Sequence, residues 1–418
     1  MSRITVIFAI AACYFVFAIL LNSVGTVILQ SINSFGIGKP EASTLEGFKD
    51  LSIALVSFLV ASFVPRIGYK QALIVGLLLV SIALLLTPIV ADFLAIKLLF
   101  ACIGASFALV KVSVYSVVGQ LSNDTRSHSS LLNTIEGIFM LGVLSGYWLF
   151  SSYIDPQNPG STTWLNVYYP LSLVTFVTAC IVMLAPIEKP LATTQVNSLK
   201  VDFLNMLKLA YQPLVLIFVL SIFLYVLIEQ SIGTWLPTFN SEVLHMPANI
   251  SIQITSIFAA MLALGRLLAG QLLKKIHWYL FLNICIALMA ILMLISLPMA
   301  NGIQTAVTNN IFDAPLAAYM LPLVGLMMAP IYPIINSVML SALDKSQHAP
   351  MTGLIVVFSA LGGTTGSIIT GLVFDSFGGL RAFYLSLIPM VLIAFTLFLF
   401  RRYNKKMSSS ILSATEAQ

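Results

Sequence analysis

Residues 71–90 read QALIVGLLLVSIALLLTPIV, a run in which no side chain carries a charge. A helix of about 20 apolar residues is long enough to cross the hydrocarbon core of a bilayer. The whole chain of 418 residues shares this character, because 59% of its residues are apolar and only 8% are charged. A soluble domain carries about 25% charged residues. Too few polar side chains remain to cover a soluble surface, so the sequence predicts an integral membrane protein embedded in the lipid bilayer.

Segments of this kind recur along the chain and predict an all-α membrane protein with twelve transmembrane helices. The expected spans are residues 4–29, 46–65, 71–90, 93–120, 129–153, 164–186, 214–239, 251–273, 279–299, 315–342, 350–374 and 381–401. The longest polar connection lies between the sixth span and the seventh. It divides the chain into a six-helix half (1–187), a linker (188–212), a second six-helix half (213–405) and a tail (406–418).

Basic side chains lie mostly at one end of the predicted spans. That end carries Arg3, Arg66, Lys70, Arg126, Lys189, Lys200, Lys208, Lys274, Lys275, Lys345, Arg401, Arg402, Lys405 and Lys406, and the other end carries Lys39, Lys49, Lys97 and Arg381. The positive-inside rule therefore predicts that both termini and the linker are cytoplasmic. The basic residues form no stripe with interleaved aromatic residues, so a nucleic-acid partner is not expected.

A weak internal repeat supports the division into two halves. Residues 61–70 (ASFVPRIGYK), after the second span, correspond to residues 270–276 (GQLLKKI), after the eighth span, at an offset near half the chain length. Two six-span halves related by a repeat are typical of secondary transporters.

This arrangement resembles the major facilitator superfamily over essentially the whole chain. The signature turn of that family reads Gly-x-x-x-Asp-Arg-x-Gly-Arg-Lys, and here Pro65 stands where the family has its acidic residue. By the resemblance, the basic turns after spans two and eight form a gate at the cytoplasmic side. The residues expected in this gate are Arg66, Gly68, Lys70, Lys274 and Lys275.

Three stretches are similar to the fucose, galactose and glucose proton symporters within the superfamily. They are residues 225–237 (YVLIEQSIGTWLP), 264–275 (LGRLLAGQLLKK) and 325–333 (GLMMAPIYP). The first half departs from that branch, because no Asp, Glu, Lys or Arg lies between Arg3 and Lys39 and because Lys111 stands where the branch has an acid. The resemblance implies a chain that works as a monomer in a bacterial inner (plasma) membrane.

Four charged side chains lie well inside the predicted spans: Lys111 in span four, Glu136 in span five, Glu229 in span seven and Arg266 in span eight. An ionisable group at the bilayer centre costs at least about 3 kcal/mol on insertion scales, so each is a candidate functional group. Glu229 and Glu136 are the candidates for proton coupling, because a carboxylate that alternates between closed and open surroundings can bind and release a proton.

Charge pairs between these groups are also expected. Lys111 and Glu136 lie on consecutive antiparallel helices at about the same depth, at about 1.5 Å of helix per residue. They are expected to form either a structural ion pair or a switch that a proton or an anionic substrate opens. Arg266 is expected either to neutralise Glu229 or to donate hydrogen bonds to an anion or a sugar hydroxyl.

Three further charges, Glu46, Lys49 and Asp50, lie at the start of span two. A solvated helix end is the favoured interpretation, and a charged ring at the outer mouth of the protein is the alternative.

By resemblance to the superfamily, spans one, four, seven and ten line the substrate cavity. Sugar hydroxyls require amides, hydroxyls and aromatic faces in a mostly apolar cavity. The cavity candidates are Asn22, Thr26, Gln30, Tyr115, Gln230, Trp235 and Asn336. Glycines spaced four residues apart in spans five and eleven allow close approach of helices, either in sliding contact between the halves or in static packing.

Motifs of other protein classes are absent from the sequence. No Walker A sequence occurs, so an ion gradient rather than ATP is the expected energy source. The four histidines lie at or near predicted helix ends, and the four cysteines lack metal-ligand spacing, so neither a metal nor a cofactor is expected. No nucleophile and base are spaced for acyl transfer, so an enzyme is not expected.

The sequence therefore favours a secondary active transporter that takes up a small hydroxylated solute, most simply a sugar, with protons by alternating access. The first alternative is an organic anion transporter, because Lys111 and Arg266 place two positive charges inside the membrane. A drug/proton antiporter is disfavoured, because span five lacks a Gly-Pro-x-x-Gly pattern. A non-transporting membrane sensor or scaffold is the alternative from another class.

Overall fold

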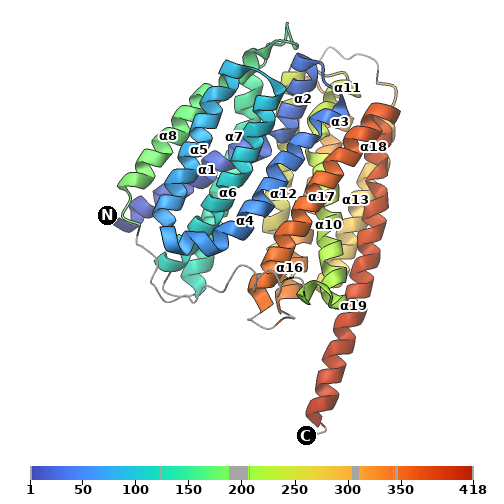
Figure 1. Cartoon of the computed structure of the whole chain (residues 1–418). Coiled ribbons are helices and arrows are strands. Elements are labelled where there is room, and N and C mark those ends of the chain that lie inside the picture. The colour runs from blue at the N-terminus through green and yellow to red at the C-terminus, as the bar shows by residue number, and fades with distance from the viewer. Residues whose placement is uncertain are drawn as a thin grey trace.

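The computed structural model describes residues 2–122, 125–187, 206, 208–303, 310–341, 343 and 347–416. The regular secondary structure of these residues is entirely helical, and the long helices run side by side as one bundle (Figure 1). We call the end of the bundle that carries Ser2 and the Gly68 turn the terminal end. The opposite end, with the turns at Gly36, Ala91 and Gly378, is the distal end.

The first half of the chain consists of long membrane helices joined by a few short helical segments. They are α1 (Ser2–Asn22), α2 (Val24–Phe35), α3 (Lys39–Ala42), α4 (Thr44–Ile67), α5 (Tyr69–Val90), α6 (Phe93–Leu121), α7 (Thr125–Ser152), the 3-10 helix η1 (Thr162–Val167) and α8 (Tyr168–Leu184). The predicted first span is interrupted at Ser23, so α1 and α2 cross the bundle together. Gly68, with a positive φ of 100°, allows the tight turn from α4 to α5.

The second half repeats this plan with more interruptions. Its helices are α10 (Pro213–Gly233), α11 (Leu236–Glu242), α12 (Ala248–Leu272), α13 (Trp278–Ala300), η2 (Ile311–Asp313), α14 (Leu316–Met320), η3 (Leu321–Leu323), α15 (Val324–Met328), α16 (Ile331–Ser341), α17 (His348–Phe377), α18 (Gly379–Leu385) and α19 (Leu387–Glu416). The seventh span breaks between α10 and α11, and the tenth breaks at Pro330, which cannot donate a backbone hydrogen bond.

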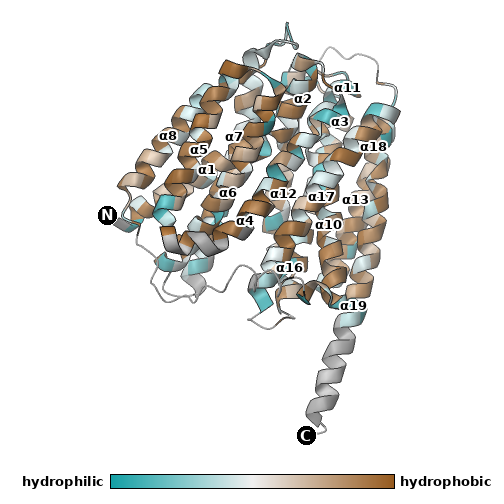
Figure 2. Cartoon of the chain, in the orientation of Figure 1, coloured by the Kyte–Doolittle hydropathy of each residue, from teal (hydrophilic) through white to brown (hydrophobic). Residues whose placement is uncertain are grey.

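Within the described residues, eleven helical segments are long and apolar enough to cross a membrane. The twelfth is α4, which has a comparable length but carries three charged residues in its first two turns. Hydrophobic residues predominate along the long helices (Figure 2). The expected all-α fold with twelve membrane helices is therefore confirmed. The linker predicted at residues 188–212 lies largely outside the described residues.

Each half has its own close helix packing. In the first half, Gly142 and Gly146 of α7 lie directly against α1. In the second half, Gly362 and Gly366 of α17 lie against α10 in the same way. The expectation that these glycines could provide sliding contacts between the halves is therefore wrong, because each pair packs its helix against a neighbour in its own half.

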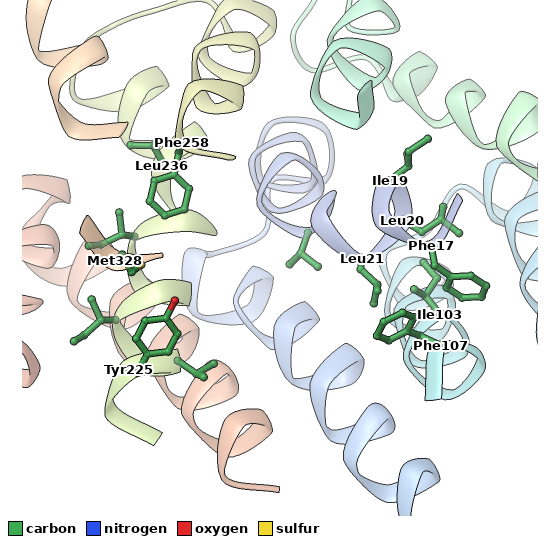
Figure 3. Close-up of a cluster of buried hydrophobic side chains, with 14 of the residues drawn as sticks. Phe17, Ile19, Leu20, Leu21, Ile103, Phe107, Tyr225, Leu236, Phe258 and Met328 are labelled. Atoms are coloured by element: carbon green, nitrogen blue, oxygen red, sulfur yellow. The ribbon is translucent and has the colours of Figure 1, made fainter. Parts of the chain in front are cut away.

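Apolar side chains fill both halves. Figure 3 shows Phe17, Leu20 and Leu21 of α1 with Ile103 and Phe107 of α6 on one side of the view. The side chains labelled on the other side come from the second half: Tyr225, Leu236, Phe258 and Met328.

The two halves meet mainly along two helix pairs, α4 with α17 and α7 with α12, with smaller contacts of α3 with α17 and of α2 with α11. The hydrogen bonds and ion pairs that join described residues of the two halves cluster toward the distal end. Lys39 Nζ lies 3.1 Å from Glu242 Oε2, and Gln253 Nε2 donates to Ser151 Oγ at 3.1 Å. Ser367 Oγ also donates to the backbone oxygen of Ser43 at 3.4 Å. The distal end is therefore closed by direct polar contacts.

Candidate functional site

Two groups of charged side chains lie inside the bundle. The first, which we call the central group, consists of Lys111 on α6, Glu136 on α7, Glu229 on α10 and Arg266 on α12. Lys111 and Glu136 lie well inside α6 and α7, whereas Arg266 lies about two turns and Glu229 about one turn before the end of its helix. The sequence predicted their depth in the membrane, and the structure gives their partners.

Both carboxylates of the central group accept a hydrogen bond from a tyrosine. Tyr115 Oη donates to Glu136 Oε1 at 2.9 Å, from α6 to α7. Tyr225 Oη donates to Glu229 Oε1 at 3.2 Å, across one turn of α10. A charged acceptor makes such hydrogen bonds stronger than neutral ones. The two carboxylates are thus held by neutral donors, one in each half.

The two cations of the central group have exposed side chains. Lys111 Nζ lies 5.8 Å from the centre of the Phe107 ring, and Arg266 Nη1 lies 4.0 Å from the sulfur of Met140 in the other half. An exposed charge at this depth is expected to face water-accessible space rather than lipid. Their neighbours, an interior ring and the opposite half, indicate the space between the halves.

The expected ion pairs do not form in this conformation. Among the described residues, no carboxylate oxygen lies within 4 Å of either Lys111 Nζ or the Arg266 guanidinium. Glu136 bonds to Tyr115 instead of Lys111, and Glu229 bonds to Tyr225 instead of Arg266. The structural pair between Lys111 and Glu136 is therefore a wrong prediction for this conformation, because a tyrosine hydroxyl satisfies the carboxylate and the ammonium stays exposed.

Further tyrosines adjoin the central group. The Tyr14 ring lies 6.4 Å from that of Tyr115, and the Tyr332 ring lies 5.6 Å from that of Tyr225. Tyr332 Oη also lies 3.3 Å from Ser359 Oγ. Sequence analysis missed Tyr14, Tyr225 and Tyr332. The spacing of four residues between Tyr225 and Glu229, which places both on one helix face, is the signal that could have identified the first contact.

The second group, which we call the distal cluster, consists of Glu46, Lys49 and Asp50 at the start of α4. Their exposed fractions are only 0%, 6% and 9%. Lys49 Nζ donates to Glu46 Oε1 and lies 3.4 Å from Asp50 Oδ1. The prediction of a solvated helix end is therefore wrong. The start of α4 is buried because α17 and α10 of the other half pack over it.

The distal cluster bonds directly to the other half. Gln230 Nε2 donates to Glu46 Oε1 at 2.5 Å, and Thr234 Oγ1 donates to Glu46 Oε2 at 3.0 Å. Gly363 of α17 lies against Asp50 Oδ2, so that a side chain there would occupy the space of the carboxylate. The cluster thus lies at the junction of α4, α10 and α17.

The predicted cavity residues fall into two sets, those with exposed or partly buried side chains and those that are fully buried. Asn22 is exposed, and its amide donates to the backbone oxygen of Ala18 at 2.9 Å where α1 ends. Tyr115, Gln230 and Asn336 are partly buried.

Three other cavity candidates are enclosed. The exposed fractions of Thr26 and Gln30 are 1%, and that of Trp235 is 0%. Trp235 Nε1 donates to the backbone oxygen of Ser367 at 3.1 Å, so the indole is part of the distal packing. These three side chains line no accessible space in this conformation.

The predicted gate at the terminal end has its expected turn. Gly68 adopts the positive φ described above, Lys70 is partly buried, and Lys274 and Lys275 are exposed. The side chain of Arg66 lies outside the described residues.

Residues 10–312 match the family profile of the Major Facilitator Superfamily. No curated protein matches the chain by sequence.

The solved structures that share the fold include the following three. A bacterial homologue of the human lysosomal transporter Spinster, inward-facing and occupied, gives a TM-score of 0.76 at 13% identity over 96% of this chain and 97% of that chain. The nucleoside transporter NupG gives a TM-score of 0.72 at 15% identity over 96% and 99%. The E. coli fucose:proton symporter FucP, in the outward conformation, gives a TM-score of 0.62 at 17% identity over 97% and 99%.

Proposed function

Because this chain belongs to the Major Facilitator Superfamily, we propose that it is a secondary active transporter that takes up a small hydroxylated solute, most simply a sugar, together with protons. The observation that carries the proposal is the central group, which combines two exposed cations with two partly buried carboxylates, each bonded to a tyrosine.

The charge balance of the central group favours an uncharged substrate. With all four groups ionised, the positive charges of Lys111 and Arg266 equal the negative charges of Glu136 and Glu229. A neutral solute leaves this balance unchanged. Carboxylates and cations offer acceptors and donors to hydroxyl groups, and the nearby tyrosine rings offer apolar faces to a sugar ring.

Glu229 and Glu136 are the proposed proton-coupling residues. Each is partly buried and bonded to a neutral tyrosine hydroxyl rather than to a cation. A carboxyl group can keep such a partner in either protonation state, because a hydroxyl both donates and accepts. Proton binding therefore need not break an ion pair first.

The orientation of the chain is part of the proposal. The terminal end carries most of the basic residues, so it is the cytoplasmic end by the positive-inside rule. The polar contacts at the distal end then make this an inward-facing conformation. We propose that the protein works as a monomer in the inner (plasma) membrane, with no cofactor beyond the proton gradient.

A small organic anion is the second candidate substrate. It is favoured by one observation, the absence of any described carboxylate within ion-pair distance of Lys111 or Arg266. Two such cations could bind an anionic group with charge-assisted hydrogen bonds.

Uptake into proteoliposomes tests the proposal, with labelled monosaccharides, nucleosides and small carboxylates and with or without an inward proton gradient. We expect gradient-driven accumulation of a monosaccharide that Glu229→Gln or Glu136→Gln reduces to exchange down the concentration gradient. The matched control is Glu41→Gln, which alters an exposed carboxylate at the distal end. Accumulation of a carboxylate that Lys111→Gln or Arg266→Gln abolishes would select the anion candidate, and no uptake or exchange of any solute would contradict transport altogether.

A further inference from the structure

The distal cluster contains more negative charge than positive charge. Two carboxylates, Glu46 and Asp50, share the single ammonium of Lys49, and all three side chains are buried. A fully ionised cluster would therefore enclose a net charge of −1. Burying a charge without a partner is costly, and proteins usually avoid the cost by changing the protonation state of the group.

The elements packed around the cluster do not supply the missing positive charge. Among the described residues, α10 presents Glu229, which adds negative charge to the surroundings of Asp50, and α7 presents the neutral Tyr147. The α17 and α6 helices present glycines, Gly363 beside Asp50 and Gly104 beside the backbone of Lys49. The positive charge of Arg266 acts on Glu229.

The geometry distinguishes the two carboxylates of the cluster. Glu46 accepts hydrogen bonds from Lys49, Gln230 and Thr234, so its negative charge is well stabilised. The polar contact described for Asp50 is the more distant one to Lys49, at 3.4 Å. Adding a proton to Asp50 therefore disturbs fewer hydrogen bonds than adding one to Glu46.

We propose that the distal cluster is a proton-binding latch, in which closure of the distal end buries Glu46, Lys49 and Asp50 together with one proton bound to an Asp50 oxygen. This inference rests on the proposed transport function, to which it adds a proton site outside the central group. When the distal end opens, α4 separates from α10 and α17, and the cluster meets the distal solution. A proton from that solution binds the Asp50 carboxylate before the halves close again.

The latch makes distal closure dependent on pH. Because the closed state holds one proton more than the open state, a higher proton concentration favours closure. Each unit of rising pH should lower the ratio of closed to open molecules by up to about tenfold for a single linked proton.

Spin-label distance measurements on the protein in lipid nanodiscs test the latch without any substrate. The labels are placed on exposed distal residues of the two halves, Gln157→Cys and Asn301→Cys, with the four native cysteines replaced by alanine. We expect the fraction with the longer distance to rise between pH 5.5 and pH 8. Asp50→Asn should remove this dependence and keep the distal end closed, because it leaves the neutral pair of Glu46 and Lys49. Asp50→Glu should restore the dependence.

The control is Glu41→Gln, which neutralises an exposed carboxylate at the distal end and should leave the pH dependence of the distance unchanged. A pH-independent distance in the parent protein, or an unchanged dependence in Asp50→Asn, would overturn the latch. If Asp50→Asn does not fold, Glu46→Gln replaces it, because it also leaves a neutral pair. A pH-dependent distance without proton-driven uptake would instead count against the proposed function alone.

Discussion

Lys49 and Lys111 lie on neighbouring helices of the same half, but their surroundings differ completely. Lys49 on α4 is 6% exposed and contacts two carboxylates. Lys111 on α6 is exposed, and its nearest described partner is the Phe107 ring. The difference shows how one residue type takes two roles. A lysine enclosed between the halves must be neutralised by carboxylates, whereas a lysine facing the space between them can remain available to a ligand.

The distal cluster and the central group differ in the same way as these two lysines. In the distal cluster, opposite charges of α4 contact each other, and hydrogen bonds from Gln230 and Thr234 to Glu46 join the two halves. In the central group, each carboxylate bonds to a tyrosine and each cation stays free of carboxylates. Enclosure by both halves thus distinguishes the distal cluster, whose charges contact one another, from the central group, whose cations are exposed.

The largest expected effect comes from removing the cation of the distal cluster. Lys49→Met leaves Glu46 and Asp50 buried without their ammonium, which should destabilise the protein by about 3–5 kcal/mol. Thermal unfolding in detergent measures the loss. Lys111→Met is the matched control and should change stability little, because Lys111 is exposed and has no carboxylate partner within the described structure. Equal losses for the two variants would contradict the comparison.

A smaller effect is expected where α17 packs on Asp50. Gly363→Ala places a methyl group against the Asp50 carboxylate, and overpacking of this kind costs about 1–3 kcal/mol. Thermal unfolding again measures the change. Gly137→Ala on α7 is the control, because nothing lies within 4 Å of its added methyl group, and it should be neutral or stabilising. A stable Gly363→Ala protein would mean that the contact between the halves is loose.

The smallest effect is expected at a surface ion pair of the distal end. Glu41→Gln removes the pair with Lys97, in which the carboxylate is 52% exposed and the two atoms lie 3.0 Å apart. Exposed pairs contribute about 0.2–1 kcal/mol, and salt screens them. We expect the unfolding temperature in detergent to change little at low salt and not at all at high salt. A loss comparable to that of Lys49→Met would show that burial does not set the strength of these pairs.

Part of the candidate site could be predicted from sequence. Lys111, Glu136, Glu229 and Arg266 were identified because a charge within an apolar run is itself unusual. Their partners could not be identified, because a hydrogen bond such as Tyr115 to Glu136 depends on the rotation of two helices about their axes. Sequence distance gives no measure of that rotation.

The sequence by itself determined the membrane setting and the twelve helices, because the length of an apolar run is a local property that the bilayer converts directly into a span. It also determined the basic turn that links the chain to its family. Only the tertiary structure decided which polar groups of the two halves meet, since Glu46 and Gln230 lie 184 positions apart in the chain. Their contact depends on how the two halves close over the start of α4, and that closure is a property of the assembled halves.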